Sequence, residues 1–309
     1  MVAIKRILCP IDFSEFSRHA LERAAAIARV QGAAITALHV VPIQPRYAPF
    51  PLEIDTSAAF ELTPAIRESL RSKLMEFATL EPHMPVDPEV SEAFAVPEEI
   101  LAQASRVRAD LIVMGTHGRG GFQRFLLGSV TERVLRTARQ PVLTVGAGDS
   151  APSAGSFKQI LCGIDFSECS LAALDYALAL ADDSNARVTA VNVIEWVPLG
   201  YDPLIGPPTD LVGYRLSAEA SSRDRLHKVI ANAKRKDVPV DEIVTSGKPH
   251  HELLRLARER GSDVIVLGIH GRNPIDRLFF GSTAEPMVRH APCPVLTVRA
   301  RFAANAAAA

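Results

Sequence analysis

Two stretches of the chain have residue types and a spacing that could bind phosphate. Each follows the pattern G-x-x-G, nine further residues and G-S, from Gly115 to Ser129 and, 153 positions later, from Gly268 to Ser282. Each comes after an apolar run and before a predicted helix, so free backbone N–H groups and the positive end of the helix dipole would face the loop. The glycines allow a close approach of the backbone to an anion. The nine-residue spacers add cations: Arg119 and Arg124, and Arg272 and Arg277.

A structural role for the same residues stays open. A lone G-x-x-G is often only a turn, and the S-x-x-E strings that begin at Ser129 and Ser282 match a capping box, in which the serine caps a helix. His117 could donate to a phosphate or pack beneath the turn. The recurrence of the whole pattern after two predicted buried strands favours phosphate binding.

Asp12 and Asp165 are further candidates for ligand contact. Each stands in the string Ile-Asp-Phe-Ser-Glu, directly after an apolar run. In a doubly wound sheet, ligands bind beyond the carboxyl ends of strands where the strand order reverses, so these carboxylates would face the glycine loops and accept from a base or a sugar. Each aspartate could instead serve only to form a turn or to support a helix cap.

The chain is a tandem repeat of one domain. The same offset of 153 residues superposes the identical strings Pro-Val-Leu-Thr-Val at 141–145 and 294–298, and self-similarity of this kind is typical of repeated domains. The expected organisation is a first domain at 1–145, a Gly-, Ser-, Ala- and Pro-rich linker at 146–156, a second domain at 157–300 and a disordered tail at 301–309.

Hydrophobic periodicity predicts strands that alternate with helices in both halves. The expected strands are 7–11, 34–41, 89–93, 110–114 and 141–145, then 160–164, 186–193, 242–245, 263–267 and 294–298. The expected helices include 65–80, 129–137, 217–234 and 282–289, with two more that begin after the capping residues Ser14 and Ser167. This alternation predicts right-handed βαβ units and a doubly wound parallel sheet. The proline-rich stretches 42–64 and 198–208 are expected to be lids, binding loops or simple connections.

Composition and charge exclude several classes of protein. With 48% hydrophobic and 22% charged residues, the chain has the composition of a soluble globular protein. A net charge of -1 does not support binding to nucleic acid or to anionic lipid. No apolar run approaches the roughly 18 residues that span a bilayer, and the start does not match a signal peptide. The four cysteines lack zinc-binding spacing and are expected to be buried thiols, which favours a cytoplasmic location.

These residues resemble the universal stress protein family, and the resemblance covers nearly all of both halves. It rests on the two aspartates, the two glycine motifs and the two closing Pro-Val-Leu-Thr-Val strings. The chain looks like a tandem member of the ATP-binding type. The resemblance implies an α/β fold of two tandem doubly wound parallel five-stranded sheets of order 3-2-1-4-5, similar to adenine nucleotide α-hydrolases. Adenine and ribose would lie near the first two strands, with the phosphates on the glycine loop.

Carried over by position, the resemblance implies two ATP sites. The first would use Pro10, Ile11, Asp12, Val40, Met114, Gly115, Gly118, Arg119, Gly128, Ser129 and Val130. The second would use Gly163, Ile164, Asp165, Val193, Leu267, Gly268, Gly271, Arg272, Gly281, Ser282 and Thr283. Asn273-Pro274 replaces Gly120-Gly121 in the second copy and stiffens its spacer.

The leading hypothesis is an ATP-binding stress-response or regulatory protein that acts through an unidentified protein partner, with Mg²⁺ held, if at all, through the phosphates. No catalytic or metal-ligating residue is assigned. A slow ATPase or a nucleotidyl-transferring enzyme on the same fold is the alternative, although neither half has the Walker pattern G-x-x-x-x-G-K-[ST]. A scaffold that binds nothing is a third class, disfavoured by the intact glycines. The resemblance also implies that 141–145 and 294–298 pair in an intramolecular pseudo-dimer; a homodimer stays open.

Overall fold

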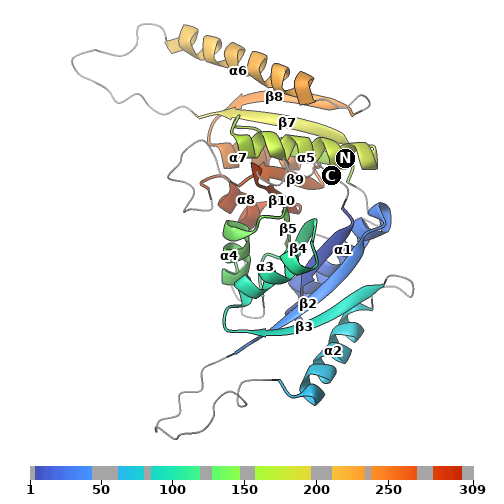
Figure 1. The fold of residues 1–309 in the computed structure, drawn as a ribbon. Helices are drawn as coiled ribbons and strands as arrows, with labels where there is room; N and C mark the ends of the chain where they lie inside the picture. Colours follow the sequence, from blue (N-terminus) through green and yellow to red (C-terminus); the bar gives the residue numbers. More distant parts are fainter. Residues whose placement is uncertain are drawn as a thin grey trace, which may run out of the picture. The chain divides into compact units, whose positions relative to one another are not determined.

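The chain forms two compact units, and each is an α/β domain with a parallel five-stranded sheet (Figure 1). The computed structural model describes residues 4–43, 62–79, 85–118, 127–146, 157–195, 211–233, 238–269 and 281–300. The first unit is Ala3–Ser156, and the second begins at Phe157. The predicted tail and all of the predicted linker beyond Gly146 lie outside the described residues.

The first unit contains five strands and four helices within the described residues. These are β1 (Arg6–Pro10), α1 (Glu15–Gln31), β2 (Ala34–Pro42), α2 (Pro64–Ala78), β3 (Val86–Ala93), α3 (Val96–Arg106), β4 (Leu111–Gly115), α4 (Ser129–Thr137) and β5 (Val142–Val145). The strand order is β3-β2-β1-β4-β5, and every described pairing is parallel. The predicted order 3-2-1-4-5 is confirmed.

The second unit repeats this arrangement. Its elements are β6 (Gln159–Gly163), α5 (Glu168–Ser184), β7 (Arg187–Ile194), α6 (Leu211–Ala233), β8 (Val240–Ser246), α7 (Pro249–Glu259), β9 (Val264–Gly268), α8 (Ala284–His290) and β10 (Val295–Val298). The order is β8-β7-β6-β9-β10, again with parallel pairings. The tandem doubly wound fold is therefore confirmed in both halves.

The strand order explains where a ligand could enter. The chain runs from β1 through β2 to β3 in one direction along the sheet, then returns to β4 on the other side of β1. Because such crossovers are right-handed, α1 and α2 cover one face and α3 and α4 the other, consistent with the packing of α3 on α4 (Figure 1). The connections beyond β1 and β4 diverge to opposite faces, and the same holds beyond β6 and β9. This reversal opens a crevice at the carboxyl ends of those strands.

The central strands form the core of each unit. Every residue of β4 is buried, and Leu8 of β1 and Ile112 of β4 are completely covered. In the second unit, Leu161 of β6 and Ile265 of β9 are equally covered. Strands buried on both faces have continuous apolar sequences, which is why the sequence pattern located them so closely.

Element ends were predicted less well where the sequence is polar. The third strands are longer than expected, since β3 begins at Val86 and β8 at Val240. Their pairing with β2 and β7 outweighs the weak strand propensity of residues such as Pro88. Helix α6 begins six residues before the predicted start, and α8 begins at Ala284 rather than Ser282.

The caps that the sequence predicted at Ser14 and Ser167 are confirmed. Each serine Oγ accepts from the backbone N–H three residues later, at 3.2 Å in both units. The two helices also end alike, in a left-handed residue: Gly32 at φ 65° and Asn185 at φ 51°. None of the described helices is long and apolar enough to cross a membrane.

Candidate functional site

The aspartate after the first strand of each unit shapes a tight turn. Asp12 Oδ1 accepts from the backbone N–H of Ser14 (3.0 Å) and from its hydroxyl (2.5 Å), and Asp165 Oδ1 accepts from Ser167 in the same way (2.9 and 2.6 Å). The turn-forming role is therefore real. The other oxygen of Asp12 faces the glycine loop, because a Cβ placed on Gly118 would lie 2.7 Å from Oδ2. The carboxylate thus builds the turn and also borders the candidate site.

The phenylalanine after each aspartate has a left-handed backbone. Phe13 has φ 64° and Phe166 has φ 66°, a conformation that bulky side chains rarely adopt. A cation lies over each ring: Lys73 Nζ is 4.6 Å from the centroid of Phe13, and Arg225 Cζ is 4.2 Å from that of Phe166. Cation–π contact at these distances is attractive and offsets part of the backbone strain.

The carbonyl before each aspartate is also held by a side chain. His39 Nδ1 lies 2.7 Å from Ile11 O, and because a carbonyl only accepts, this nitrogen carries the proton. At the corresponding place Asn192 Nδ2 donates to Ile164 O (2.7 Å). The carbonyls of both turns are thereby fixed to the neighbouring strand.

The first glycine of each motif is required for packing. A Cβ on Gly115 would lie 2.8 Å from Phe16 Cβ, and one on Gly268 would lie 2.6 Å from backbone atoms of Cys169 and Ser170. Real Cβ atoms essentially never come so close. The end of β4 therefore fits against α1, and the end of β9 against α5, only when the strand residue is glycine.

The later glycines shape the return of the loop to the sheet. Gly128 N–H donates to Thr116 O (2.9 Å), and Thr131 Oγ1 donates to Gly115 O (2.9 Å). Gly281 has φ 85°, a left-handed conformation that glycine adopts without strain. These bonds hold the end of the first loop against its beginning.

The capping-box interpretation of the two serines is wrong. Ser129 is the first residue of α4 and the cap is Gly128, while α8 is capped by Thr283, one residue after Ser282. Neither cap residue makes a side-chain capping hydrogen bond. The ring of His117 packs against Phe16, at 5.0 Å between ring centroids, and its Nδ1 lies 2.9 Å from Thr116 Oγ1. Its donation to a phosphate stays a prediction.

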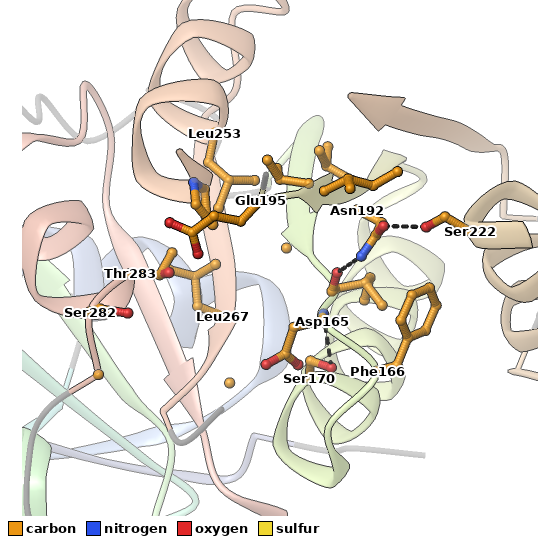
Figure 2. A pocket seen from close by; sticks show the side chains of 18 of the residues that line it. Asp165, Phe166, Ser170, Asn192, Glu195, Ser222, Leu253, Leu267, Ser282 and Thr283 are labelled. Carbon is orange, nitrogen blue, oxygen red and sulfur yellow. Dashed lines mark hydrogen bonds between the residues drawn. The ribbon is translucent and has the colours of Figure 1, made fainter. Parts of the chain in front are cut away.

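A cavity of about 590 Å³ lies at the carboxyl ends of β6, β7 and β9 in the second unit (Figure 2). Helix α6 and the first turns of α7 and α8 complete its wall. It is lined by nine residues predicted for the second site: Gly163, Ile164, Asp165, Val193, Leu267, Gly268, Gly281, Ser282 and Thr283. The other two, Gly271 and Arg272, lie outside the described residues. The volume is within the range of sites for small organic ligands.

Polar side chains line this cavity on two sides. In Figure 2, Ser282 and Thr283 lie on one side and Asn192 and Ser222 on the other, with Asp165 between them. Hydroxyl groups therefore border both sides of the cavity, and the carboxylates of Asp165 and Glu195 also line it.

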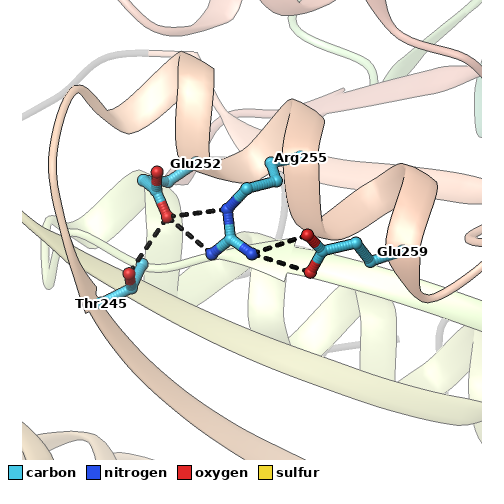
Figure 3. Close-up of polar contacts among 4 residues, drawn as sticks. All are labelled: Thr245, Glu252, Arg255 and Glu259. Carbon is cyan, nitrogen blue, oxygen red and sulfur yellow. Dashed lines mark hydrogen bonds and ion pairs between the residues drawn. The ribbon is translucent and has the colours of Figure 1, made fainter.

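A polar network joins α7, which forms one wall of the cavity, to β8 (Figure 3). Thr245 Oγ1 donates to Glu252 Oε2 (3.1 Å), which also accepts from Arg255 Nη2 (2.7 Å), and Arg255 Nη1 donates to Glu259 (2.7 and 2.8 Å). The hydrogen bond from Arg255 is the main reason that the pKa of Glu252 lies below its usual value. Leu253, between these residues, lines the cavity.

The residues predicted for the first site gather in the same place in their own unit. They lie at the ends of β1, β2 and β4, in the turns that follow, or at the start of α4: Pro10, Ile11, Asp12, Val40, Met114, Gly115, Gly118, Gly128, Ser129 and Val130. Arg119 lies outside the described residues. The approach of Gly118 to Asp12 shows that the aspartate and the glycine loop meet.

Sequence reasoning missed the contribution of α6 to the cavity. Ser221, Ser222 and Arg225 line it, as does Glu195 at the end of β7. No sequence signal was available for Arg225, because its equivalence to Lys73 appears only once Leu74 and Leu226, which are 152 residues apart, are both seen to be fully buried. A search at the single offset of 153 conceals this pair.

The described residues contain no cluster of three or more His, Cys, Asp or Glu side chains that could hold a metal ion. Cys9, Cys162 and Cys293 are buried, as predicted, whereas the prediction is wrong for Cys169, which is half-buried. Burial raises the pKa of the Cys9 and Cys162 thiols. Neither is available as a thiolate ligand at neutral pH.

The sequence model of the universal stress protein family matches residues 3–146 and 156–299. The chain belongs to this family. A universal stress protein of Mycolicibacterium smegmatis is 28% identical over 96% of this chain and 97% of its own length. One from Methanocaldococcus jannaschii is 36% identical over 46% of this chain and 82% of its own length. The crystal structure of a universal stress protein from Archaeoglobus fulgidus covers 97% of this chain and 98% of its own, with a TM-score of 0.62 at 21% identity, and shows the same fold.

Proposed function

We propose that this universal stress protein binds ATP at the carboxyl ends of both sheets and acts as a stress-response or regulatory nucleotide-binding protein. One observation carries the proposal: every described residue that the family resemblance assigned to the second site lines a single cavity. The assignment was carried over from the family resemblance, so its agreement with one cavity in the fold supports a common ligand.

The lining of the cavity suits an adenine nucleotide. Ile164, Val193 and Leu267 offer apolar contact to a base, and the Asp165 carboxylate can accept from an amino group or from ribose hydroxyls. At the other end, the hydroxyls of Ser282 and Thr283 can donate to phosphate oxygens. Mg²⁺, where it accompanies the nucleotide, would be held through the phosphates.

The first unit offers the same arrangement around Asp12 and Gly118. Its β1–α1 turn has the same hydrogen bonds as the β6–α5 turn, and its glycine loop closes onto α4. We therefore propose two sites in each chain.

Thermal unfolding with and without ATP tests the proposal. A ligand at 100 times its Kd stabilises the folded protein by about 2.7 kcal/mol, which for a domain of this size raises the melting temperature by about 5–10 °C. ADP and AMP, titrated in parallel, measure what each phosphate adds. An unchanged melting temperature with all three nucleotides would reject the proposal. Mass spectrometry of nucleotide released from the purified protein identifies the bound species directly.

The proposal is for binding rather than catalysis. Multiple-turnover release of phosphate, lost when both glycine loops are altered, would instead favour the slow ATPase or nucleotidyl-transferring alternative. The expectations of a cytoplasmic location, of a protein partner, of pairing between 141–145 and 294–298 and of a homodimer stay predictions.

A further inference from the structure

The turn that carries Asp165 depends on support from outside itself. Phe166 holds a left-handed backbone at φ 66°, while the Asp165 carboxylate accepts from both groups of Ser167 and the Asp165 N–H donates to Ser170 Oγ (3.3 Å). Residues in such conformations persist where the surrounding structure determines them. Contacts to the residues on either side of Asp165 therefore add to the bonds that hold its carboxylate in place.

Helix α6 supplies those contacts on both sides. Arg225 lies over the ring of Phe166, at 4.2 Å from its centroid. Ser222 donates to Asn192 Oδ1, and Asn192 in turn donates to Ile164 O (Figure 2). Because Ser222 and Arg225 are three residues apart, they project from the same face of the helix. One helical face thus holds the residue before Asp165 and the residue after it.

The first unit makes the equivalent contacts with different side chains. Lys73 of α2 lies over Phe13, Phe77 of the same helix packs edge-on against that ring at 5.5 Å, and His39 holds Ile11 O. The left-handed phenylalanine, the helical cation above it and the bonded carbonyl before the aspartate all recur. A chance packing contact in one unit would not be expected to recur with altered chemistry.

We infer that Arg225 and Ser222 are positioning residues that set the Asp165 carboxylate for ligand binding, so that the docking of α6 and occupancy of the second cavity are linked. The inference rests on the proposed function. Linkage is reciprocal, so a nucleotide that binds the positioned carboxylate also stabilises the docked helix.

The first test needs no ligand, because the Ser167 N–H donates to Asp165 Oδ1 and its hydrogen exchange reports on the carboxylate. In the full-length protein, Arg225→Gln is expected to speed that exchange about tenfold, the order of effect that loss of one cation–π contact produces. Arg225→Lys should restore protection, since lysine already fills this role in the first unit. Lys228→Gln is the control: it removes an exposed cation from the same helix that pairs only with Asp224 in the contacts described. Unchanged exchange in Arg225→Gln would overturn the inference.

The second test measures ATP affinity at the second cavity, in a Gly118→Val background that obstructs the first. Arg225→Gln is expected to weaken binding about tenfold, Arg225→Lys to bind within about threefold of the parent, and Lys228→Gln to leave it unchanged. If Arg225 acts through Asp165, adding Arg225→Gln to the Asp165→Asn variant should weaken ATP binding little further. Additive losses would mean that the guanidinium contacts the nucleotide itself, which would overturn a positioning role.

The two proposals can fail separately. If the wild-type protein binds no ATP, the proposed function falls, while the exchange of the Ser167 N–H still decides whether α6 positions Asp165. If ATP binds but Arg225→Gln changes neither exchange nor affinity, the positioning role falls and nucleotide binding stands.

Discussion

The same substitution at two glycines three residues apart should damage two different properties of the protein. At Gly118, an alanine Cβ would lie 2.7 Å from Asp12 Oδ2, while the next nearest atom, Asp12 Cγ, is 3.8 Å away. The conflict therefore involves one carboxylate oxygen, which must move by roughly 0.7 Å to reach ordinary contact. Asp12 cannot turn freely, because its other oxygen is held at 3.0 and 2.5 Å by Ser14.

The expected loss of ATP affinity follows from the hydrogen bonds that the movement of the Asp12 carboxylate strains. A hydrogen bond to a charged group contributes about 1.5–3 kcal/mol, so losing the equivalent of one such bond from the binding-competent turn weakens ATP binding by about 10- to 150-fold. The conflict is at the end of a side chain in a half-buried turn. Gly118→Ala should therefore leave the melting temperature of the ligand-free protein within about 2 °C of the wild type.

Gly115→Ala provides the contrast. Its Cβ would meet Phe16 Cβ at 2.8 Å and the Phe16 backbone carbon at 2.9 Å. Relief requires α1 to shift away from β4, and overpacking of this kind costs about 1–3 kcal/mol, or about 3–10 °C in melting temperature.

Calorimetric titration with ATP and thermal unfolding of both variants separate the two effects. In the titration, Gly118→Ala should weaken or remove one of two sites and leave the other at wild-type affinity. The reasoning would be refuted if Gly118→Ala bound two ATP molecules as tightly as the wild type, or if it destabilised the ligand-free protein as much as Gly115→Ala.

Three further predictions concern stability and reactivity. Gln103 is 1% exposed and its Nε2 has no hydrogen-bond partner among the described residues, while Leu256 occupies the equivalent position in the second unit. Gln103→Leu should therefore raise the free energy of unfolding by about 1 kcal/mol and Leu256→Gln should lower it; denaturant titrations with the opposite order would contradict this. The pKa of Glu252 is lowered in the folded protein, so its carboxylate stabilises the fold above the unfolded pKa of about 4.3, and this contribution disappears as the pH falls through the lower folded pKa. The difference in the free energy of unfolding between wild type and Glu252→Gln should therefore be present at pH 7 and absent at pH 2. An equal difference at both pH values would exclude the carboxylate as its source. The thiols of Cys9 and Cys162 should resist an alkylating reagent until the protein unfolds, since both are fully buried, and mass spectrometry of the labelled native protein would reveal any early reaction.

The sequence predicted those features that depend on local pattern. The central strands were located because burial on both faces requires an unbroken apolar run, as in Leu111–Gly115. The caps at Ser14 and Ser167 were located because a serine before a helical period is a local signal. The strand order came from the family resemblance, since no local pattern encodes which strands become neighbours.

The features that the sequence concealed depend on contacts between distant segments. Nothing near Val86 indicates a strand except its pairing with Ile35, and nothing near Arg225 indicates a site until α6 packs over Phe166. The S-x-x-E string at Ser129 was misleading for a related reason. The local pattern fits a cap, but Gly128 is held to Thr116 O and becomes the cap itself, which moves the serine into the helix.

The division of roles among the glycines changes what the motif signifies. The first glycine of each copy is needed to seat a strand end against a helix, and it would be required whether or not a ligand bound. The second, at Gly118, is needed only if the carboxylate of Asp12 must keep its place beside the loop. A copy that had lost nucleotide binding would therefore be free to replace the second glycine while it kept the first. Both copies here keep both glycines, together with the aspartate that follows the first strand, and this pattern is expected when both turns are used to bind a ligand.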